Sequence, residues 1–255
     1  MKKYLIAILY LFIIAIPFSC DKASSDSSSF SNGGNATGTG GSTARFTIVG
    51  NYLYTVDKAN LKVFSIADLT SPILKNTVPV GFEIETIYPF KDKLFIGSTS
   101  VVYIFSIANP ELPQKLSTAI SPNVLRRCDP VIARDTVAYA TLRTNSACGG
   151  GTQSILAVYD IRDIQNPVQK TFRPLQEPYG LGFADSALYV ATQTGLNVYN
   201  IAKEYEPVFI SNVRSQDWFY DVIPYGNTLI AWTKDGVVLF DITIRKTPVF
   251  ITKII

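Results

Sequence analysis

Short stretches of apolar and β-branched residues alternate with turn residues along the chain after residue 45. In the segment 85–118 these stretches are Glu85–Phe90, Leu94–Gly97, Val101–Ile107 and Gln114–Thr118. The segment 220–255 repeats the plan with Tyr220–Tyr225, Leu229–Thr233, Val237–Ile242 and Val249–Ile255. Hairpin-type turn residues such as Gly226-Asn227 separate them, and no window keeps a 3.6-residue period. The pattern therefore predicts short β-strands and essentially no helix.

A fixed phrase recurs five times in this pattern: an aromatic residue, a small or acidic polar residue, an isoleucine, and a proline six residues after the isoleucine. The five isoleucine–proline pairs are Ile66/Pro72, Ile107/Pro113, Ile161/Pro167, Ile201/Pro207 and Ile242/Pro248. The isoleucines are 41, 54, 40 and 41 residues apart. A period near 40 residues is typical of a repeat protein.

Five units with four strands each predict an all-β fold, namely a five-bladed β-propeller with four antiparallel strands per blade. This repeat length is typical of propeller blades. A β-sandwich is the alternative, but a sandwich does not require the same residue columns five times. The proline before each fourth strand fits an edge strand, where a missing N–H is tolerated.

The core phrases resemble the LVIVD repeat of bacterial envelope-associated propeller proteins. They are Val63-Phe64-Ser65-Ile66, Val158-Tyr159-Asp160-Ile161 and Leu239-Phe240-Asp241-Ile242, and the resemblance covers Arg45–Ile255. A narrower resemblance, to Bacteroidetes-like lipoproteins of this family, rests on Cys128-Asp129-Pro130-Val131, Tyr139-Ala140-Thr141-Leu142 and Cys148-Gly149-Gly150. The resemblance implies a fold and a location in the cell envelope, and no particular reaction.

The first 19 residues are typical of a secretory signal. Lys2 and Lys3 precede an apolar run from Tyr4 to Phe18, which is shorter than the roughly 20 residues of a membrane span. Cys20 follows Ser19 directly after this run, and this arrangement resembles a bacterial lipobox, in which the thiol is lipidated. The alternative is an ordinary cleaved signal with a chance cysteine. We expect residues 1–19 to be a lipoprotein signal peptide and Cys20 to carry the lipid.

Residues 20–44 are expected to form a lipid-anchored flexible linker before the propeller of residues 45–255. The linker is almost entirely Ser, Gly, Asn, Thr and Asp, which cannot bury enough apolar surface to become ordered, and it gives a reach of roughly 27 Å. The expected location is therefore the cell envelope, with the outer membrane favoured and with a periplasmic or surface-exposed propeller. Without Lys2 and Lys3 the 23 basic residues fall to 21, against 20 acidic ones, so nucleic acid is not expected as a partner.

The third repeat is longer than the others. Counting between strand anchors places ten extra residues between its second and third strands and about three before its first strand. Each insertion carries a cysteine, Cys128 or Cys148, and in an up-and-down blade both rise from one face. Since the envelope is oxidising, we predict a Cys128–Cys148 disulfide, worth around 3 kcal/mol by chain entropy. The alternatives are metal ligation and a reactive thiol.

The chain contains no histidine, which excludes Ser-His-Asp and Cys-His nucleophiles and histidine-ligated zinc. It also contains no phosphate-binding P-loop and no calcium-binding loop of the EF-hand type. We therefore predict no catalytic residue, no metal site and no cofactor.

The segments leading into the first strands carry acids, arginines and aromatic residues that we expect on one face of the propeller. They are Glu83, Glu85, Arg126, Arg127, Asp129, Tyr179, Trp218, Tyr220 and Asp221. Such a set suits a glycan, because aromatic faces stack on sugars and carboxylates accept their hydroxyls, or a protein partner, because Trp, Tyr and Arg are enriched at interfaces.

Sequence reasoning thus favours a non-catalytic envelope lipoprotein whose propeller face binds a protein partner or a glycan. One alternative is an envelope carbohydrate-active enzyme in which two carboxylates among Glu83, Glu85, Asp129 and Asp221 act as a glycosidase pair. Another is that these acids cap turns and the aromatic residues fill the packing between blades.

Overall fold

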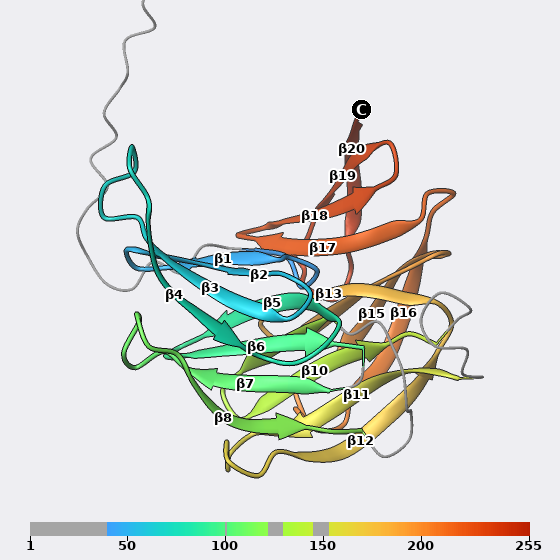
Figure 1. Cartoon of the computed structure of the whole chain (residues 1–255). Helices are drawn as coiled ribbons and strands as arrows, with labels where there is room; N and C mark the ends of the chain where they lie inside the picture. The colour runs from blue at the N-terminus through green and yellow to red at the C-terminus, as the bar shows by residue number, and fades with distance from the viewer. Residues whose placement is uncertain (1–39, 100, 122–129, 145–152) are drawn as a thin grey trace, which may run out of the picture. The chain divides into compact units, whose positions relative to one another are not determined.

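A computed structural model describes residues 40–99, 101–121, 130–144 and 153–255 (Figure 1). Within these residues there is no helix, and hence none long and apolar enough to cross a membrane. Twenty strands form five separate antiparallel sheets of four strands, and each sheet follows the order of the chain from its inner to its outer strand. The predicted five-bladed β-propeller is confirmed.

Each blade consists of consecutive strands. Blade 1 contains β1 (Phe46–Val49), β2 (Tyr52–Val56), β3 (Asn60–Ser65) and β4 (Ile73–Pro79). Blade 2 contains β5 (Ile84–Phe90), β6 (Lys93–Ser98), β7 (Val102–Ser106) and β8 (Gln114–Ala119). Blade 3 contains β9 (Val131–Arg134), β10 (Val137–Leu142), β11 (Ser154–Asp160) and β12 (Val168–Leu175). Blade 4 contains β13 (Pro178–Ala184), β14 (Ala187–Thr192), β15 (Gly195–Asn200) and β16 (Val208–Arg214). Blade 5 contains β17 (Phe219–Tyr225), β18 (Thr228–Thr233), β19 (Gly236–Asp241) and β20 (Val249–Ile254).

The repeated phrase marks the place where the third strand of each blade pairs with the fourth. In all five blades the register shifts immediately before the repeat aromatic, at Phe64, Phe105, Tyr159, Tyr199 and Phe240. Such a shift is a β-bulge, which bends and twists the strand. The repeat proline then directly precedes the outer strand, as predicted. The two insertions of blade 3 lie before β9 and between β10 and β11, also as predicted.

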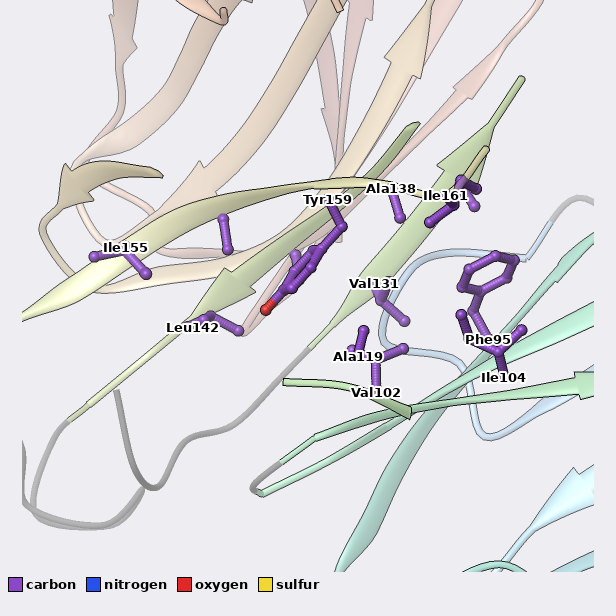
Figure 2. Packing of buried hydrophobic residues seen from close by; sticks show 13 residues of the cluster. Phe95, Val102, Ile104, Ala119, Val131, Ala138, Leu142, Ile155, Tyr159 and Ile161 are labelled. Atoms are coloured by element: carbon purple, nitrogen blue, oxygen red, sulfur yellow. The ribbon is translucent and has the colours of Figure 1, made fainter. Parts of the chain in front are cut away.

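Four apolar clusters fill four junctions between neighbouring blades. In the junction between blades 2 and 3, Phe95 and Ile104 face Ala138 and Tyr159 (Figure 2). Comparable clusters join blade 1 to blade 2, blade 3 to blade 4 and blade 4 to blade 5. Blades 2, 3 and 4 are therefore covered on both faces, which explains why β10, β11 and β14 consist entirely of buried residues.

No corresponding cluster joins blade 5 to blade 1 in the described part of the chain. One position of the first strand is equivalent in all five blades. It is occupied by Phe46, Ile87, Val131, Leu181 and Val222 in blades 1 to 5. Phe46 of blade 1 is 61% exposed, whereas the other four are 0–1% exposed. On the face of blade 5 that has no apolar cluster with blade 1, Trp232 is 52% exposed. The two end blades thus each leave one apolar face uncovered.

A tyrosine on the second strand links neighbouring blades in three places. The hydroxyl of Tyr54 donates to the carbonyl of Pro110, that of Tyr139 to Glu204, and that of Tyr189 to Arg245. Each acceptor lies in the loop between the third and fourth strands of the next blade. Burial raises the pKa of all three phenols, so the hydroxyls keep their protons and act as donors.

Replacing Tyr139 with phenylalanine is expected to lower the free energy of unfolding by about 1 kcal/mol, because the Glu204 carbonyl loses its partner. Phe95 occupies the equivalent position of blade 2, so a phenylalanine ring can be accommodated at this position of a blade. Tyr225→Phe is the control, since Tyr225 is 67% exposed. Urea unfolding of both variants measures the difference, and equal stability would show that the inter-blade hydrogen bond contributes nothing.

The polar residue before the repeat isoleucine caps a turn in blades 2 to 5. The side chains of Ser106, Asp160, Asn200 and Asp241 each accept the backbone N–H two residues later. This local hydrogen bond stabilises the turn that follows the third strand. It explains why a polar residue recurs immediately before the repeat isoleucine. Of these four residues, Asp160 also makes two ion pairs, with Arg162 Nη2 at 2.6 Å and with Lys170 Nζ at 3.6 Å.

The Asp160→Asn variant should keep the turn, as Asn200 does in blade 4, but lose both ion pairs. The side chain of Arg162 holds the pKa of Asp160 well below its usual range, so this stabilisation is present above the ordinary carboxyl pKa, shrinks as the pH falls below it and vanishes only below the lowered pKa. We expect the variant to be about 1 kcal/mol less stable than the wild type at pH 7, because the arginine is mostly exposed, and we expect a smaller difference at pH 2. Urea unfolding at both pH values tests this, and a difference that does not shrink between pH 7 and pH 2 would contradict the assignment to ion pairs.

Candidate ligand-binding site at the mouth of the propeller

Residues 41–44 belong to the folded domain, although their composition predicted a linker. Ser42 is 1% exposed, and its hydroxyl donates to Asp221 Oδ1 at 2.9 Å and accepts the backbone N–H of Leu181 at 2.7 Å. Thr43 donates to Asp221 Oδ2 from both its backbone N–H and its hydroxyl. This segment therefore bonds to blades 4 and 5, and the linker boundary predicted at residue 44 is corrected to about residue 40.

Asp221 is buried and not available to a ligand. It is 5% exposed and accepts four hydrogen bonds, of which the fourth comes from the N–H of Val222. Gly41 and Gly180 lie against the carboxylate so closely that a Cβ atom at either position would collide with it. Burial raises the pKa of Asp221, while the hydrogen bonds from Thr43, Ser42 and Val222 act in the opposite direction. Its role is to hold the N-terminal segment in place.

A cavity of about 250 Å³ lies beside this network, where the first strands of blades 1 to 4 begin. We call it the mouth. Its polar and aromatic lining includes Arg45, Glu85, Arg143 and Tyr179. The Arg143 guanidinium stands over the Tyr179 ring at 4.1 Å from the centroid, which is cation–π geometry. The mouth therefore offers two cations, one carboxylate and an aromatic ring within one cavity.

A row of aromatic rings leads from the mouth across blade 5. Tyr179 and Tyr220 meet edge to face with centroids 5.5 Å apart, and Tyr220 meets Trp232 at 5.2 Å. The hydroxyl of Tyr179 also accepts a hydrogen bond from Gln193. Because each ring is held by its neighbours, Tyr179 is positioned firmly at the edge of the cavity.

The structure brings together part of the predicted set. Glu85 and Tyr179 line the mouth, and Tyr220 packs beside Tyr179. Glu83 instead accepts a hydrogen bond from the Thr99 hydroxyl at 2.5 Å, and its backbone has a φ of 53°. Trp218 is 47% exposed and does not line the cavity. The remaining predictions, Cys20, Arg126, Arg127, Asp129 and the Cys128–Cys148 disulfide, lie outside the described residues.

Sequence reasoning missed Arg45, Arg143 and Trp232. Arg45 directly precedes β1 and Arg143 directly follows β10, so both flank strand ends on the face that carries the loops into the first strands. The position of Trp232 in the second strand is occupied in blades 1 to 4 by Val56, Gly97, Thr141 and Ala191. A tryptophan where the other four blades carry smaller residues could have been noticed in the sequence.

No protein-family profile matches this chain, and no curated protein is significantly similar to it. Among solved structures, it is similar to a protein from Desulfotomaculum acetoxidans DSM 771 described as functionally unknown, with a TM-score of 0.62 and 12% identity over 80% of this chain and 68% of that one. It is also similar to a protein from Lactobacillus plantarum, with a TM-score of 0.58 and 13% identity over 81% and 73% of the two chains. At such identities the similarity shows the fold alone, so the comparisons support the β-propeller and assign no activity.

Proposed function

We propose that this protein is a non-catalytic lipoprotein of the bacterial cell envelope and that the mouth of its propeller binds a protein partner or a glycan. The observation that carries the proposal is the mouth itself, with Arg143 stacked on Tyr179 beside Arg45 and Glu85. Stacked arginine and tyrosine are the residues that concentrate binding energy at interfaces. The two guanidinium groups also donate hydrogen bonds in a fixed fork to carboxylate or hydroxyl oxygens.

The arrangement of carboxylates supports binding over catalysis. A glycosidase needs two carboxyl groups facing one sugar-sized space. Of the four predicted candidates, Asp221 is buried and accepts four hydrogen bonds, Glu83 accepts a hydrogen bond from Thr99, Glu85 lines the mouth, and Asp129 lies outside the described residues. The described residues therefore supply one carboxylate to the cavity rather than a pair.

The membrane anchor is supported by Lys2, Lys3, the apolar run to Phe18 and Cys20, and the resemblance to LVIVD-repeat lipoproteins implies the same location. Labelling of cells with radioactive palmitate should mark the wild-type protein and not Cys20→Ala. Thiol labelling of the mature protein under native conditions should find Cys128 and Cys148 unreactive until a reductant is added. An unlabelled wild type, or two freely reactive thiols, would refute the respective assignment.

Two experiments test the mouth. In the first, a photoreactive amino acid replaces Arg45 in the full chain and intact envelopes are irradiated. In the second, the protein is applied to an array of envelope glycans. We expect one cross-linked protein or one retained glycan class, and its loss in Arg143→Ala. Lys203→Ala is the charge-matched control, because Lys203 is exposed in a loop between third and fourth strands, on the opposite face. Equal binding by Arg143→Ala and Lys203→Ala would show that the mouth is not the site.

A further inference from the structure

A second concave surface lies between blades 3 and 4, outside the predicted site. Two cavities, of about 660 Å³ and about 570 Å³, share Pro174, Leu175, Gln176 and Thr194 and so form one continuous groove. Each is within the size range of small-molecule sites. We call this surface the blade 3–4 groove.

The groove leads toward the mouth. Its inner end is lined by Gln193, whose amide donates to the hydroxyl of Tyr179 at 3.2 Å, and by Thr144, which follows the mouth residue Arg143. Its outer end reaches Pro207 and Phe209 beside the outer strand of blade 4. An extended molecule fits this path better than a compact one.

The lining of the groove is rich in uncharged polar groups. Four amides, Gln153, Gln176, Gln193 and Asn197, accompany threonine hydroxyls, while the charged side chains are Arg173 and Glu177. An amide offers both donors and an acceptor, which matches a sugar hydroxyl in either role. Gln153 and Gln176 are both exposed, and their side chains make no hydrogen bond to another described residue.

Phe209 supplies an aromatic platform at the outer end. It is 54% exposed, and the ring of the buried Tyr199 holds it edge to face with centroids 5.6 Å apart. A rigid exposed ring beside amide groups suits the apolar C–H face of a pyranose. We propose that the blade 3–4 groove binds a neutral, extended oligosaccharide, with Phe209 stacking on one sugar and the amides of Gln153 and Gln176 bonding its neighbours.

A peptide is the competing ligand, and the lining favours the sugar over it. Peptide recognition relies on an added strand, on apolar anchor pockets or on charge clusters. The groove has a single exposed aromatic platform and one side chain of each charge, which suits ligands without net charge. This proposal rests on the proposed function only in the choice of a glycan as ligand, since the site is separate from the mouth.

The test is titration calorimetry of the whole chain with neutral tetrasaccharides of glucose, mannose and N-acetylglucosamine. We expect at least one to bind, Phe209→Ala to weaken it at least tenfold, and Gln176→Ala to weaken it severalfold. Phe250→Ala is the matched control, because Phe250 occupies the equivalent position of blade 5, is 59% exposed and lines neither of the two cavities of the groove. It should bind as the wild type does.

Several results would overturn the proposal. These are absence of binding by all tetrasaccharides, equal weakening by Phe209→Ala and Phe250→Ala, or tighter binding of uronic-acid tetrasaccharides or of an unstructured peptide. Arg143→Ala distinguishes binding in the groove from binding at the mouth. We expect its affinity for the tetrasaccharide to stay within twofold of the wild-type value. If Arg143→Ala abolishes tetrasaccharide binding and Phe209→Ala does not, the groove fails while the proposed function of the mouth stands.

Discussion

Truncating Leu181 to alanine is expected to lower the free energy of unfolding by about 2–5 kcal/mol, whereas truncating the larger Phe46 should cost less than about 1 kcal/mol. Both residues occupy the same inner-strand column, in blade 4 and in blade 1. Leu181 is 1% exposed in the junction with blade 3, while Phe46 is 61% exposed at the open junction with blade 5. The cost of a truncation follows the apolar contacts that are lost, so the junction decides the outcome more than the size of the side chain.

Urea unfolding monitored by near-ultraviolet circular dichroism measures both variants, and an unchanged slope with denaturant shows that the unfolded state is the same. Ile87→Ala is the second buried control, because Ile87 is 1% exposed in the same column of blade 2. If Phe46→Ala costs as much as Leu181→Ala, then blades 1 and 5 pack against each other in solution and the junction is closed.

The Asp221→Ala variant should lose about 3 kcal/mol of stability and release residues 40–44 from blades 4 and 5. The change removes the acceptor of four hydrogen bonds and leaves donors on the buried Ser42 and Val222 and on the half-buried Thr43 without this partner. Hydrogen exchange at the amide of Thr43 should accelerate by orders of magnitude. Asp241→Ala is the control, because Asp241 is exposed and bonds only Thr243 among the described residues.

The pH dependence identifies Asp221 specifically. Because burial raises its pKa in the folded state, the folded protein binds a proton that the unfolded chain has released, and stability falls as the pH rises from the ordinary carboxyl pKa through the raised one. Asp221→Ala should lack this fall. An Asp221→Ala variant that keeps both its stability and the wild-type pH profile would contradict the role assigned to this carboxylate.

The strands could be predicted to within about one residue because their signals are local. Val249–Ile255 was expected and Val249–Ile254 is observed, and Gly226-Asn227 forms the predicted turn between β17 and β18. The number of blades could be predicted from the repeated phrase for the same reason. Its polar residue, its β-bulge and its proline each determine the conformation of the backbone next to them. The open junction could not be predicted, because Phe46 is an apolar residue at the same inner-strand position as the buried Ile87, Val131, Leu181 and Val222.

The site was harder to predict because its residues meet only in space. Asp221 looked like a surface acid from its aromatic neighbours, yet Ser42 and Thr43, 179 and 178 residues away in the sequence, cover it. Those small residues looked like linker, although small side chains are what allow such a close approach to the carboxylate. Arg45 and Arg143 carried no motif and became significant only when the ends of four blades surrounded one cavity.

By itself, then, the sequence determined the class of fold, the number of blades, the position of the irregular third blade and the absence of histidine chemistry, because periodicity, turn residues and composition act over a few residues. Only the tertiary structure decided which acid is buried, which arginine meets Tyr179, and which pair of blades leaves its apolar faces uncovered. These depend on contacts between segments that are distant in the chain, and such contacts are set by how the blades pack together.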